Sequence, residues 1–475
     1  MNAFNILSGQ EVQKLHSASL DILNTIGLRV ESKKARKMLE EAGAKVNHET
    51  MMVRFPHNFA DESIKKAPQR IVYGARNPKY DLVLEPGGAT YCRPLIGAEG
   101  YMDLETGKYR HAQLSDVKEW ATLVDALENI SYNAGPYPAE PPLDEGGDVR
   151  VLRILLENTE KHLGAYSGKY PERYMKYMIE LAVAVMGSEE ELKKRPIFNL
   201  VVGTLSPLVI DELTTDTFSL FGKYGIPIEL VPMPIAGGTG PVTIAGLTLL
   251  AHTELLAGII VAEIINPGAP MVYRPGPVIM DMSSGAGLEA TVENAMVAAA
   301  GAQLMRETYG IPTNMMGQVT DTFIPDGQSM IERTFNTLLP TLAGANLVSG
   351  AGQIEHVYAE DPVQLVIDDE IVGMTKRILR GFEINDDTLG LEALARVGPG
   401  GNFLSDDHTL KYFKTEYYKP RIFNRGTREI WQSKGGKDLN ENARERAKTI
   451  LREHKPTPLA DDVLKELDSI IKKLG

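Results

Sequence analysis

The chain has 475 residues, of which 43% are hydrophobic and 24% charged, as is typical of a soluble globular protein with a large core. Its net charge of −13 argues against nucleic acid and anionic membrane as partners, because an acidic surface repels phosphate. The single cysteine, Cys92, excludes an internal disulfide and a cysteine-based zinc site. Because the first residues also lack the basic and apolar regions of a signal peptide, we expect a cytoplasmic protein.

The first 88 residues are predicted to form a separate α+β cap. Ser8, with a glutamate three positions later, has the spacing of a capping box at the start of a helix. A second helix is expected over residues 32–42. Short apolar runs at 52–55 and 70–73 are predicted to be strands.

A repeated cadence occupies residues 89–385. Short apolar runs alternate with helix-like stretches of roughly 20 to 35 residues. The eight runs are residues 90–96, 130–134, 163–167, 197–202, 228–233, 271–274, 313–317 and 347–350. Eight β-then-α units predict an α/β fold of the (β/α)8 TIM barrel type. Because active sites of this fold lie at the carboxyl ends of the strands, the residues that follow each run are candidates for function.

Residues 386–475 are predicted to be an extension that packs on the barrel. They begin as an aromatic-rich, irregular segment and end in two charged helices near 440–453 and 459–474. The extension contains no low-complexity tract.

The longest apolar stretch, residues 241–265, is predicted to be a buried helix or a helix at a subunit interface. It contains His252, Glu254 and Glu263, which a membrane-spanning helix would tolerate badly. The small residues of this stretch and of 287–305 suit a tight contact in a homo-oligomer, but they suit barrel packing equally well.

The common catalytic signatures are missing from the sequence. It has no GxGxxG, Walker A, GxSxG or HExxH motif. His252 and Glu254 lie two residues apart and face different sides of a helix, so we predict no metal site. Lys169 follows the third run and leaves a Schiff-base lyase open as an alternative enzyme class.

Aromatic and acidic side chains gather at the predicted strand ends. Tyr137, Tyr166 and Tyr273 each follow or end a run, and the loops at 317–323 and 350–358 add acids and further rings. A cation without N–H groups must be held by ring faces and carboxylates, so this rim suits a quaternary ammonium. Packing of the tyrosines at the rim is the alternative.

A glycine-rich loop, PIAGGTGPVT at 234–243, follows the fifth run. Glycines let another molecule approach the backbone closely, and the next helix begins with free N–H groups. A phosphate site, a landing surface for a large cofactor or partner, and a tight structural turn are all compatible with this loop.

Three sequence blocks together resemble a known family. They are PMPIAGGTGPVT, TDTFIPDGQ with the later LAGANLVSGAGQIE, and the C-terminal GPGGNFLSDDHTL followed by KPRIFNRG and a tryptophan. With them the chain resembles, over nearly its whole length, the trimethylamine methyltransferase family in its branch without pyrrolysine. Members of that branch characterised as enzymes include glycine betaine:corrinoid methyltransferases.

The resemblance implies a TIM barrel that transfers a methyl group from a methylamine to the Co(I) of a separate, cognate corrinoid protein. Trimethylamine-specific members carry pyrrolysine in the loop after the seventh strand. The matching stretch here, residues 320–328, has only standard residues, with Phe323 or Ile324 at that place. We therefore expect a quaternary amine as substrate, glycine betaine first and proline betaine or carnitine as alternatives. A quaternary-amine-binding barrel without turnover is the non-enzymatic alternative.

Roles for individual residues follow as hypotheses. Tyr137, Tyr166, Tyr273 and Phe323 would form the aromatic wall around the trimethylammonium group, and Asp321 and Glu355 would add negative charge. Arg274 or His356 would bind a substrate carboxylate, unless Arg274 pairs with an internal acid and Asp321 caps the next helix. Gly237, Gly238, Gly240 and Gln318 would face the corrinoid of the partner protein, which is the methyl acceptor; no cofactor is expected within this chain itself.

Overall fold

The computed structural model describes residues 3–139, 146–166 and 172–474 of the chain. In these residues seven strands and one further extended segment pair in parallel and close on one another. Four strands form one run, namely β9 (Leu163–Tyr166), β10 (Phe198–Val202), β12 (Ile228–Leu230) and β14 (Met271–Tyr273). Three strands form the other, namely β17 (Asn314–Met316), β18 (Leu347–Ser349) and β6 (Tyr91–Arg93).

Two junctions turn these runs into a barrel. On one side, Tyr273 of β14 forms a parallel bridge with Thr313, just before β17. On the other side, residues 130–134 lie between β6 and β9, because the Ser131 N–H donates to the Cys92 carbonyl at 2.6 Å and Asn133 bridges Leu163 in parallel. Each of the eight predicted runs therefore supplies one strand or extended segment of the barrel wall, which confirms the predicted α/β barrel.

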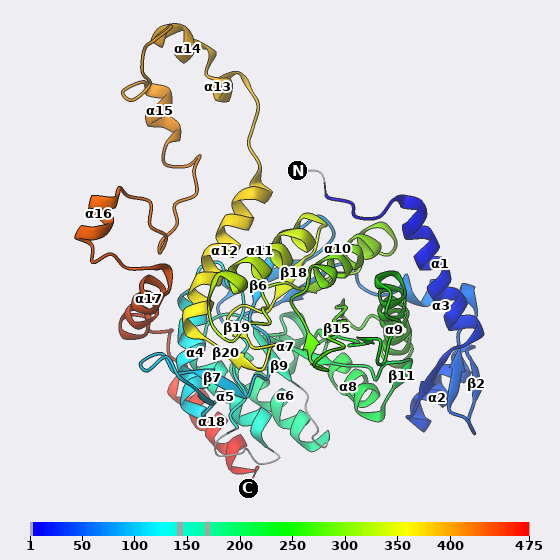
Figure 1. The fold of residues 1–475 in the computed structure, drawn as a ribbon. Helices are drawn as coiled ribbons and strands as arrows, with labels where there is room; N and C mark the ends of the chain where they lie inside the picture. Colours follow the sequence, from blue (N-terminus) through cyan, green and yellow to red (C-terminus); the bar gives the residue numbers. More distant parts are fainter. Residues whose placement is uncertain (1–2, 140–145, 167–171, 475) are drawn as a thin grey trace.

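Helices cover the outside of this barrel between consecutive strands (Figure 1). They are α4 (Leu114–Ala126), α5 (Gly147–Asn158), α6 (Glu172–Met186), α7 (Glu189–Lys194), α8 (Glu212–Lys223), α9 (Ile244–Ile265), α10 (Val292–Glu307), α11 (Gly327–Leu342) and α12 (Pro362–Arg380). Many begin where the sequence offers a polar cap, as Thr243 does for α9 and Asp361 for α12. In the described residues α9 is one helix with the length and apolarity of a membrane span, but 78% of its most apolar window is buried. It packs against α1, α3, α8 and α10, as a core helix does.

The N-terminal elements pack against this core helix, and the first of their strands pairs in parallel with residues 209–210. They are α1 (Gly9–Thr25), β1 (Leu28–Val30), α2 (Lys33–Ala42), β2 (Lys45–Asn47), β3 (Met52–Arg54), α3 (His57–Ile64), β4 (Ile71–Tyr73), the 3-10 turn η1 (Pro78–Tyr80) and β5 (Leu82–Leu84). The predicted capping box of Ser8 and Glu11 begins α1. Tyr73 stacks on His162 with ring centroids 4.3 Å apart, and its hydroxyl donates to Glu229 inside the barrel at 3.2 Å.

Short strands extend the carboxyl end of the barrel. They are β7 (Gly100–Met102), β8 (Tyr109–His111), β11 (Val209–Ile210), β13 (Ile235–Ala236), β15 (Val278–Met280), β16 (Gly287–Leu288), β19 (Gln353–Ile354) and β20 (Ala359–Glu360). Among the described residues, β13, β15 and β16 form one small sheet, and β19, β20, β7 and β8 form another. These sheets raise the wall around the mouth of the barrel.

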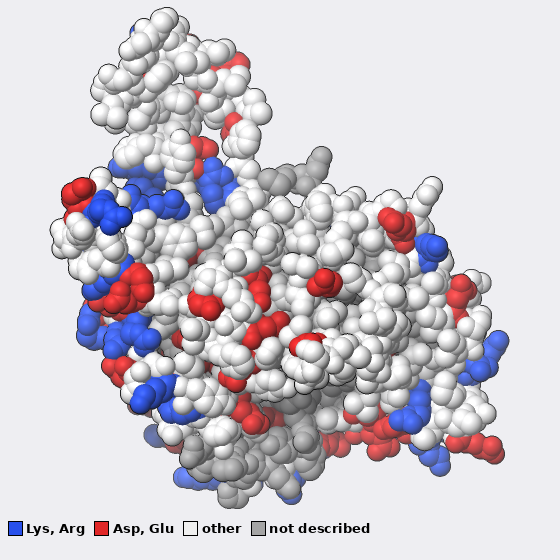
Figure 2. Space-filling model, viewed as in Figure 1, with Lys and Arg blue, Asp and Glu red and all other residues white. Residues whose placement is uncertain are grey.

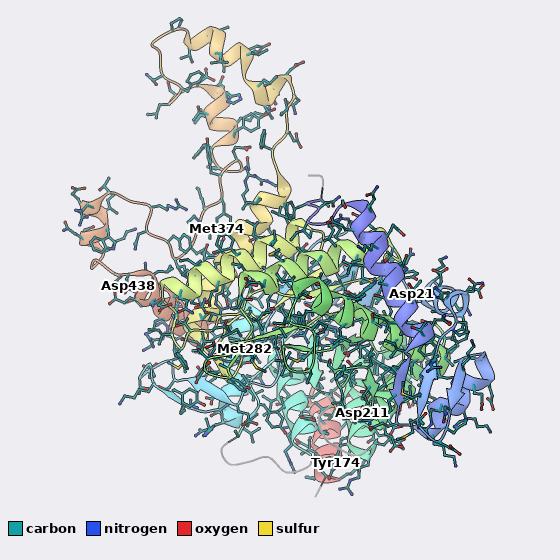
Figure 3. All side chains as sticks on the ribbon, turned by 45° about the vertical axis from the view of Figure 1, so that its right-hand side comes forward. Asp21, Tyr174, Asp211, Met282, Met374 and Asp438 are labelled. Carbon is teal, nitrogen blue, oxygen red and sulfur yellow. The ribbon has the colours of Figure 1, made fainter. Side chains whose placement is uncertain are left out.

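The C-terminal extension packs on the barrel only in part, which corrects the sequence prediction. Its last helices, α17 (Leu439–Glu453) and α18 (Asp461–Lys472), do pack, α17 against α12 and α4 and α18 against α5 and α6. Residues 382–415, which we call the arm, stand away from the body in both views (Figures 1 and 3). The arm contains α13 (Asp386–Leu389), α14 (Leu391–Val397) and α15 (Asp407–Tyr412), and α16 (Arg428–Ser433) follows it.

The arm has almost no core of its own. Within it, all of which the structure describes, Ala393 is the one buried side chain. Its exposed large apolar side chains are Phe382, Ile384, Leu389, Leu391, Leu394, Phe403, Leu404, Leu410 and Phe413. The space-filling view shows the outer part of the arm with few charged side chains (Figure 2).

Candidate functional site

A cavity of about 590 Å³ opens at the carboxyl ends of the barrel strands. It is lined by residues that follow β6, β10, β12, β14, β17 and β18, namely Arg93, Leu95, Ile96, Gly97, Val201, Gly203, Thr204, Val231, Met233, Ile235, Arg274, Gly276, Val278, Gly287, Glu289, Met316, Gln353, His356, Val357 and Tyr358. This is where barrel enzymes place their active sites. A hollow of about 750 Å³ lies elsewhere, on the outer surface between α6, α8 and α18, and strand ends do not line it.

A fully buried carboxylate lies beneath the cavity, where it pairs with the lining residue Arg93. Glu229, on β12, accepts hydrogen bonds from Arg93 at 2.5 Å, Asn314 at 2.8 Å and Tyr132 at 2.7 Å. Burial raises the pKa of Glu229, but the charges of Arg93 and Arg274 and these hydrogen bonds outweigh burial, so its pKa lies below the ordinary value. Glu229 is therefore ionised at neutral pH.

Arg274 brings a second guanidinium to the same place with far weaker pairing. It follows β14, is 5% exposed, and its Nε lies 3.9 Å from Oε2 of Glu229. That Nε has no hydrogen-bond partner among the described residues, and Nη2 meets only the sulfur of Met316, at 3.4 Å. Burial, followed by the charge of Arg93, lowers the pKa of Arg274 to about 10, so the group stays cationic at neutral pH.

Glu289 adds an acid that does not neutralise this charge. It follows β16, is 6% exposed, and its Oε2 has no partner in the described part of the chain. Burial, reinforced by the charge of Asp321, raises the pKa of Glu289 to about 8, against the opposing effect of Arg274. Arg274 is therefore the buried guanidinium of this cavity that its neighbours pair least completely. Such a group can donate hydrogen bonds to an anionic ligand.

One wall of the cavity is a strained loop. Glu355, His356 and Val357 have φ values of 56°, 52° and 67°, in the left-handed region that residues with side chains seldom adopt. Asp321 fixes this loop, because it accepts from His356 Nδ1 at 3.0 Å and from the backbone N–H of Glu289 at 2.9 Å. Backbone strain of this kind clusters at ligand-binding sites, where the surrounding structure must maintain it.

The structure brings several predicted site residues to this mouth. Arg274 and His356 line the cavity. Phe323 lies on the rim, 60% exposed, with its ring 6.2 Å from that of His356. Glu355 is half-buried in the strained loop and does not line the cavity. Asp321 ties loops together, and the helix it was expected to cap begins instead at Asp326.

Tyr273 and Gln318 do not reach the cavity, which corrects two predictions. Successive residues of a strand point to opposite faces, so Tyr273 and Arg274 cannot both face the barrel interior. Tyr273 points outward and is 1% exposed, with its hydroxyl 3.1 Å from Nδ1 of His252 on α9. Gln318 is fully buried, where it accepts from Cys92 Sγ at 2.5 Å and donates to the Asp368 carbonyl on α12 at 3.3 Å.

The remaining predicted residues lie near the mouth or outside the described set. Tyr137 lines a small cleft that shares Ile96 with the main cavity. The side chain of Tyr166, at the end of β9, and Lys169 lie outside the described residues. The glycine-rich loop forms a tight exposed turn, in which the Gly237 N–H donates to the Gly240 carbonyl at 3.0 Å; Gly238 lies between them and Ile235, just before the turn, lines the cavity.

Some residues of the site were missed from the sequence although a signal existed. Arg93 and Glu229 are charged residues inside apolar strand-like runs, and such residues are buried only when paired. Glu289 gave no such signal, because its place just before a helix is ordinary for an acid. Among the described residues, no group of three or more His, Cys, Asp or Glu side chains is arranged to hold a metal ion.

A closed parallel barrel with a charged cavity at the carboxyl ends of its strands is the architecture of the barrel enzymes. Comparison with known proteins gives the family. The family model for trimethylamine methyltransferase (MTTB) matches residues 1–474. The chain therefore belongs to the trimethylamine methyltransferase family and is an enzyme of the methyltransferase type.

Individual relatives agree with this assignment. The trimethylamine methyltransferase MttB of Desulfitobacterium hafniense (strain DSM 10664 / DCB-2) is 31% identical over 468 residues, which cover 98% of this chain and 93% of the relative. The glycine betaine methyltransferase of Desulfitobacterium hafniense (strain Y51) is 30% identical over 477 residues, which cover 99% and 97%. A crystal structure of the hydroxylamine complex of MtmB has the same fold, with a TM-score of 0.50, 13% identity and coverage of 98% and 92%.

Proposed function

We propose that this protein transfers a methyl group from a small quaternary amine, glycine betaine first, to the Co(I) of a cognate corrinoid protein and releases dimethylglycine. The observation that carries the proposal is the incompletely paired guanidinium of Arg274 on the floor of a cavity that opens at the barrel mouth. A guanidinium fork matches a carboxylate in two parallel hydrogen bonds. The substrate carboxylate then lies deep, and its trimethylammonium group points toward the opening.

The wall of the cavity supports this orientation. A quaternary ammonium has no N–H to donate, so it is stabilised by ring faces, polarisable groups and nearby negative charge. Tyr358, His356 and Met233 lie at the outer part of the lining. A bound cation stabilises the ionised form of Glu289, whose pKa of about 8 in the empty site leaves it mostly neutral. On the face that carries β15, β19 and β20, acidic side chains also occupy the centre while Lys and Arg lie toward the edges (Figure 2).

The rim supports docking of a large, flat acceptor. Gly237, Gly238 and Gly240 present a turn in which Thr239 alone carries a side chain, so another molecule can approach the backbone closely. Beside the mouth, Met282 is 75% exposed (labelled in Figure 3) and Phe323 is 60% exposed. Apolar surface left open around a cavity is typical of a site that a partner covers.

The chemistry asks little of the chain beyond binding. A Co(I) corrinoid supplies the nucleophile, and a quaternary amine leaves as a neutral tertiary amine once its N–CH3 bond breaks, so no general acid or base is required. The residues of this chain hold the carboxylate, orient the N–CH3 bond toward the mouth and exclude water. Reduced corrinoid requires a reducing compartment, and we propose a cytoplasmic location, which also suits the free thiol of Cys92.

The size of the cavity favours a second candidate within the same class. At about 590 Å³ it falls within the usual range for ligand pockets, and it accommodates a longer zwitterion such as carnitine or proline betaine. These molecules carry the same pair of charges, so Arg274 would serve them in the same way.

A single assay tests the proposal. The protein is mixed with a corrinoid protein held as Co(I) and with glycine betaine, proline betaine, carnitine, choline or trimethylamine in turn. We expect loss of the Co(I) absorption and release of the tertiary amine with one or more of the carboxylated quaternary amines, and no reaction with trimethylamine. Betaine binding by calorimetry without loss of Co(I) would identify a binding protein instead, and turnover of trimethylamine would contradict the need for a permanent charge.

A further inference from the structure

The arm cannot be stable as an isolated projection. Its longest helix, α14, has 7 residues. Isolated helices shorter than about 12–15 residues are marginal in water and depend on packing of an apolar face. Yet the apolar residues of the arm point into solvent, with Leu404 87% and Phe382 77% exposed. The arm therefore needs a surface that covers it.

Both ends of the arm are held at α12. It leaves the end of α12, and just beyond it Glu416 pairs with Arg377 of α12 at 3.1 Å. Two residues further, the Tyr418 hydroxyl donates to Glu370 of α12 at 2.8 Å. The arm thus begins and ends at α12 and is not a free tail.

The same chain exposes a second apolar surface that its own arm does not cover. Val292 and Met296 lie one turn apart on α10, and Ile331 and Phe335 lie one turn apart on α11. Their exposures are 57%, 39%, 62% and 56%, and the two helices pack side by side. We call these four residues the α10–α11 patch. α11 also packs against α12, and the arm that follows α12 extends away from these helices (Figures 1 and 3).

We infer that the arm docks on the α10–α11 patch of a second copy of this chain, and that the second copy returns its arm in the same way. A two-fold arrangement of this kind satisfies every arm and every patch, because each subunit donates one and receives one. The inference concerns assembly and does not depend on the substrate.

The area involved fits a permanent assembly. With each large apolar side chain contributing on the order of 100 Å², one arm offers about 900 Å². Two reciprocal arms then offer about 1,800 Å², which lies within the roughly 1,200–2,000 Å² of a standard stable interface. A methyl acceptor must leave after each transfer, whereas the arm needs cover throughout the life of the fold. A second copy, which is present at equal concentration whenever the chain is made, meets that need.

The test uses the full chain in sedimentation velocity at micromolar concentration. One variant changes the arm (Leu391→Asp with Leu394→Asp), one changes the patch (Ile331→Asp with Phe335→Asp), and Ile26→Asp, 53% exposed at the end of α1, is the matched control. We expect the unchanged chain and the control to form dimers or an even multiple, and both double variants to be monomers. A mixture of arm and patch variants regains association, because one arm–patch contact in the mixed pair is intact.

Circular dichroism and thermal unfolding establish that each variant is folded. Should a double variant unfold, Leu394→Cys protein mixed with Phe335→Cys protein and a bismaleimide gives the same answer, since Cys92 is buried and does not react. A cross-linked dimer between the two chains supports the inference. The inference is overturned by a monomeric unchanged chain, by an arm variant that keeps the mass of the unchanged assembly, or by a mixture that stays monomeric. It is also overturned if the arm becomes protected from solvent only when the corrinoid protein is added.

Discussion

Replacing Arg274 by methionine tests the charge arrangement of the cavity most directly. In the proposed complex the guanidinium donates two charge-assisted hydrogen bonds to the substrate carboxylate. At about 1.5 kcal/mol each, their loss weakens binding by about 3 kcal/mol, or about 100-fold in Kd. Methionine keeps the unbranched apolar stem of the side chain and removes the guanidinium group.

The same substitution is expected to leave the fold intact. Glu229 keeps its hydrogen bonds from Arg93, Asn314 and Tyr132, whereas Nε of Arg274 lies 3.9 Å away and makes no hydrogen bond to it. No carboxylate is therefore orphaned, and we expect the free energy of unfolding to change by no more than about 1 kcal/mol.

Calorimetric titration with glycine betaine and with choline separates the effect of the carboxylate from that of the onium. The Arg274→Met variant should lose betaine affinity and keep whatever affinity it has for choline, which lacks a carboxylate. Arg274→Lys should lose part of the affinity, because an ammonium keeps the charge but not the fork. Unchanged betaine binding in Arg274→Met, or an equal loss for both ligands, would refute the assignment of the carboxylate to this residue.

Further outcomes concern buried groups and close packing. The folded-state pKa of Glu289 is raised to about 8, so the folded protein binds a proton that the unfolded chain releases, and the free energy of unfolding falls as pH rises from about 5 through 8. Glu289→Gln should remove this fall, as measured by urea unfolding at pH 6 and 8.5. An equal fall in the free energy of unfolding for both proteins would contradict the prediction. Lys161 donates to three main-chain carbonyls at 2.6–2.7 Å, so Lys161→Met should cost at least about 3 kcal/mol in chemical denaturation, and a loss below 1 kcal/mol would show that water replaces the ammonium. A Cβ at Gly317 would overlap Val348 and lie 3.0 Å from the Asn336 carbonyl oxygen, so Gly317→Ala should destabilise by about 2 kcal/mol, whereas Gly327→Ala, with open space around it, should be neutral or stabilising; equal melting temperatures for the two variants would disprove the close contact.

The alternation of apolar runs and helices could be predicted from the sequence because its signals lie in residues that are close along the chain. Each strand is recognised from its own short run of β-branched and aliphatic residues. Each helix is recognised from its own periodicity and from a capping residue such as Ser8 or Asp361. The (β/α)8 class and the position of the mouth follow from that periodicity. The residues at the end of the sixth run could likewise be placed at the mouth, and Arg274 is there.

The sequence did not show whether a residue at a strand end faces the inside or the outside of the barrel. Tyr273 and Arg274 are neighbours, and the pleat sends one inward and one outward according to the register of β14 against β12. Gln318 follows β17 by two residues, but the turn there directs it against Cys92 and α12. A difference of one residue in register is enough to exchange such roles.

The sequence by itself determined the kinds of element, their order and the family resemblance, because periodicity, caps and motifs are written in residues that are close along the chain. The tertiary structure alone decided that Glu289, with its raised pKa, meets a poorly paired Arg274 and that the arm stands free of the body. The physical reason is that charge balance and burial depend on groups far apart in sequence, and only the closed barrel sets the distances over which they interact.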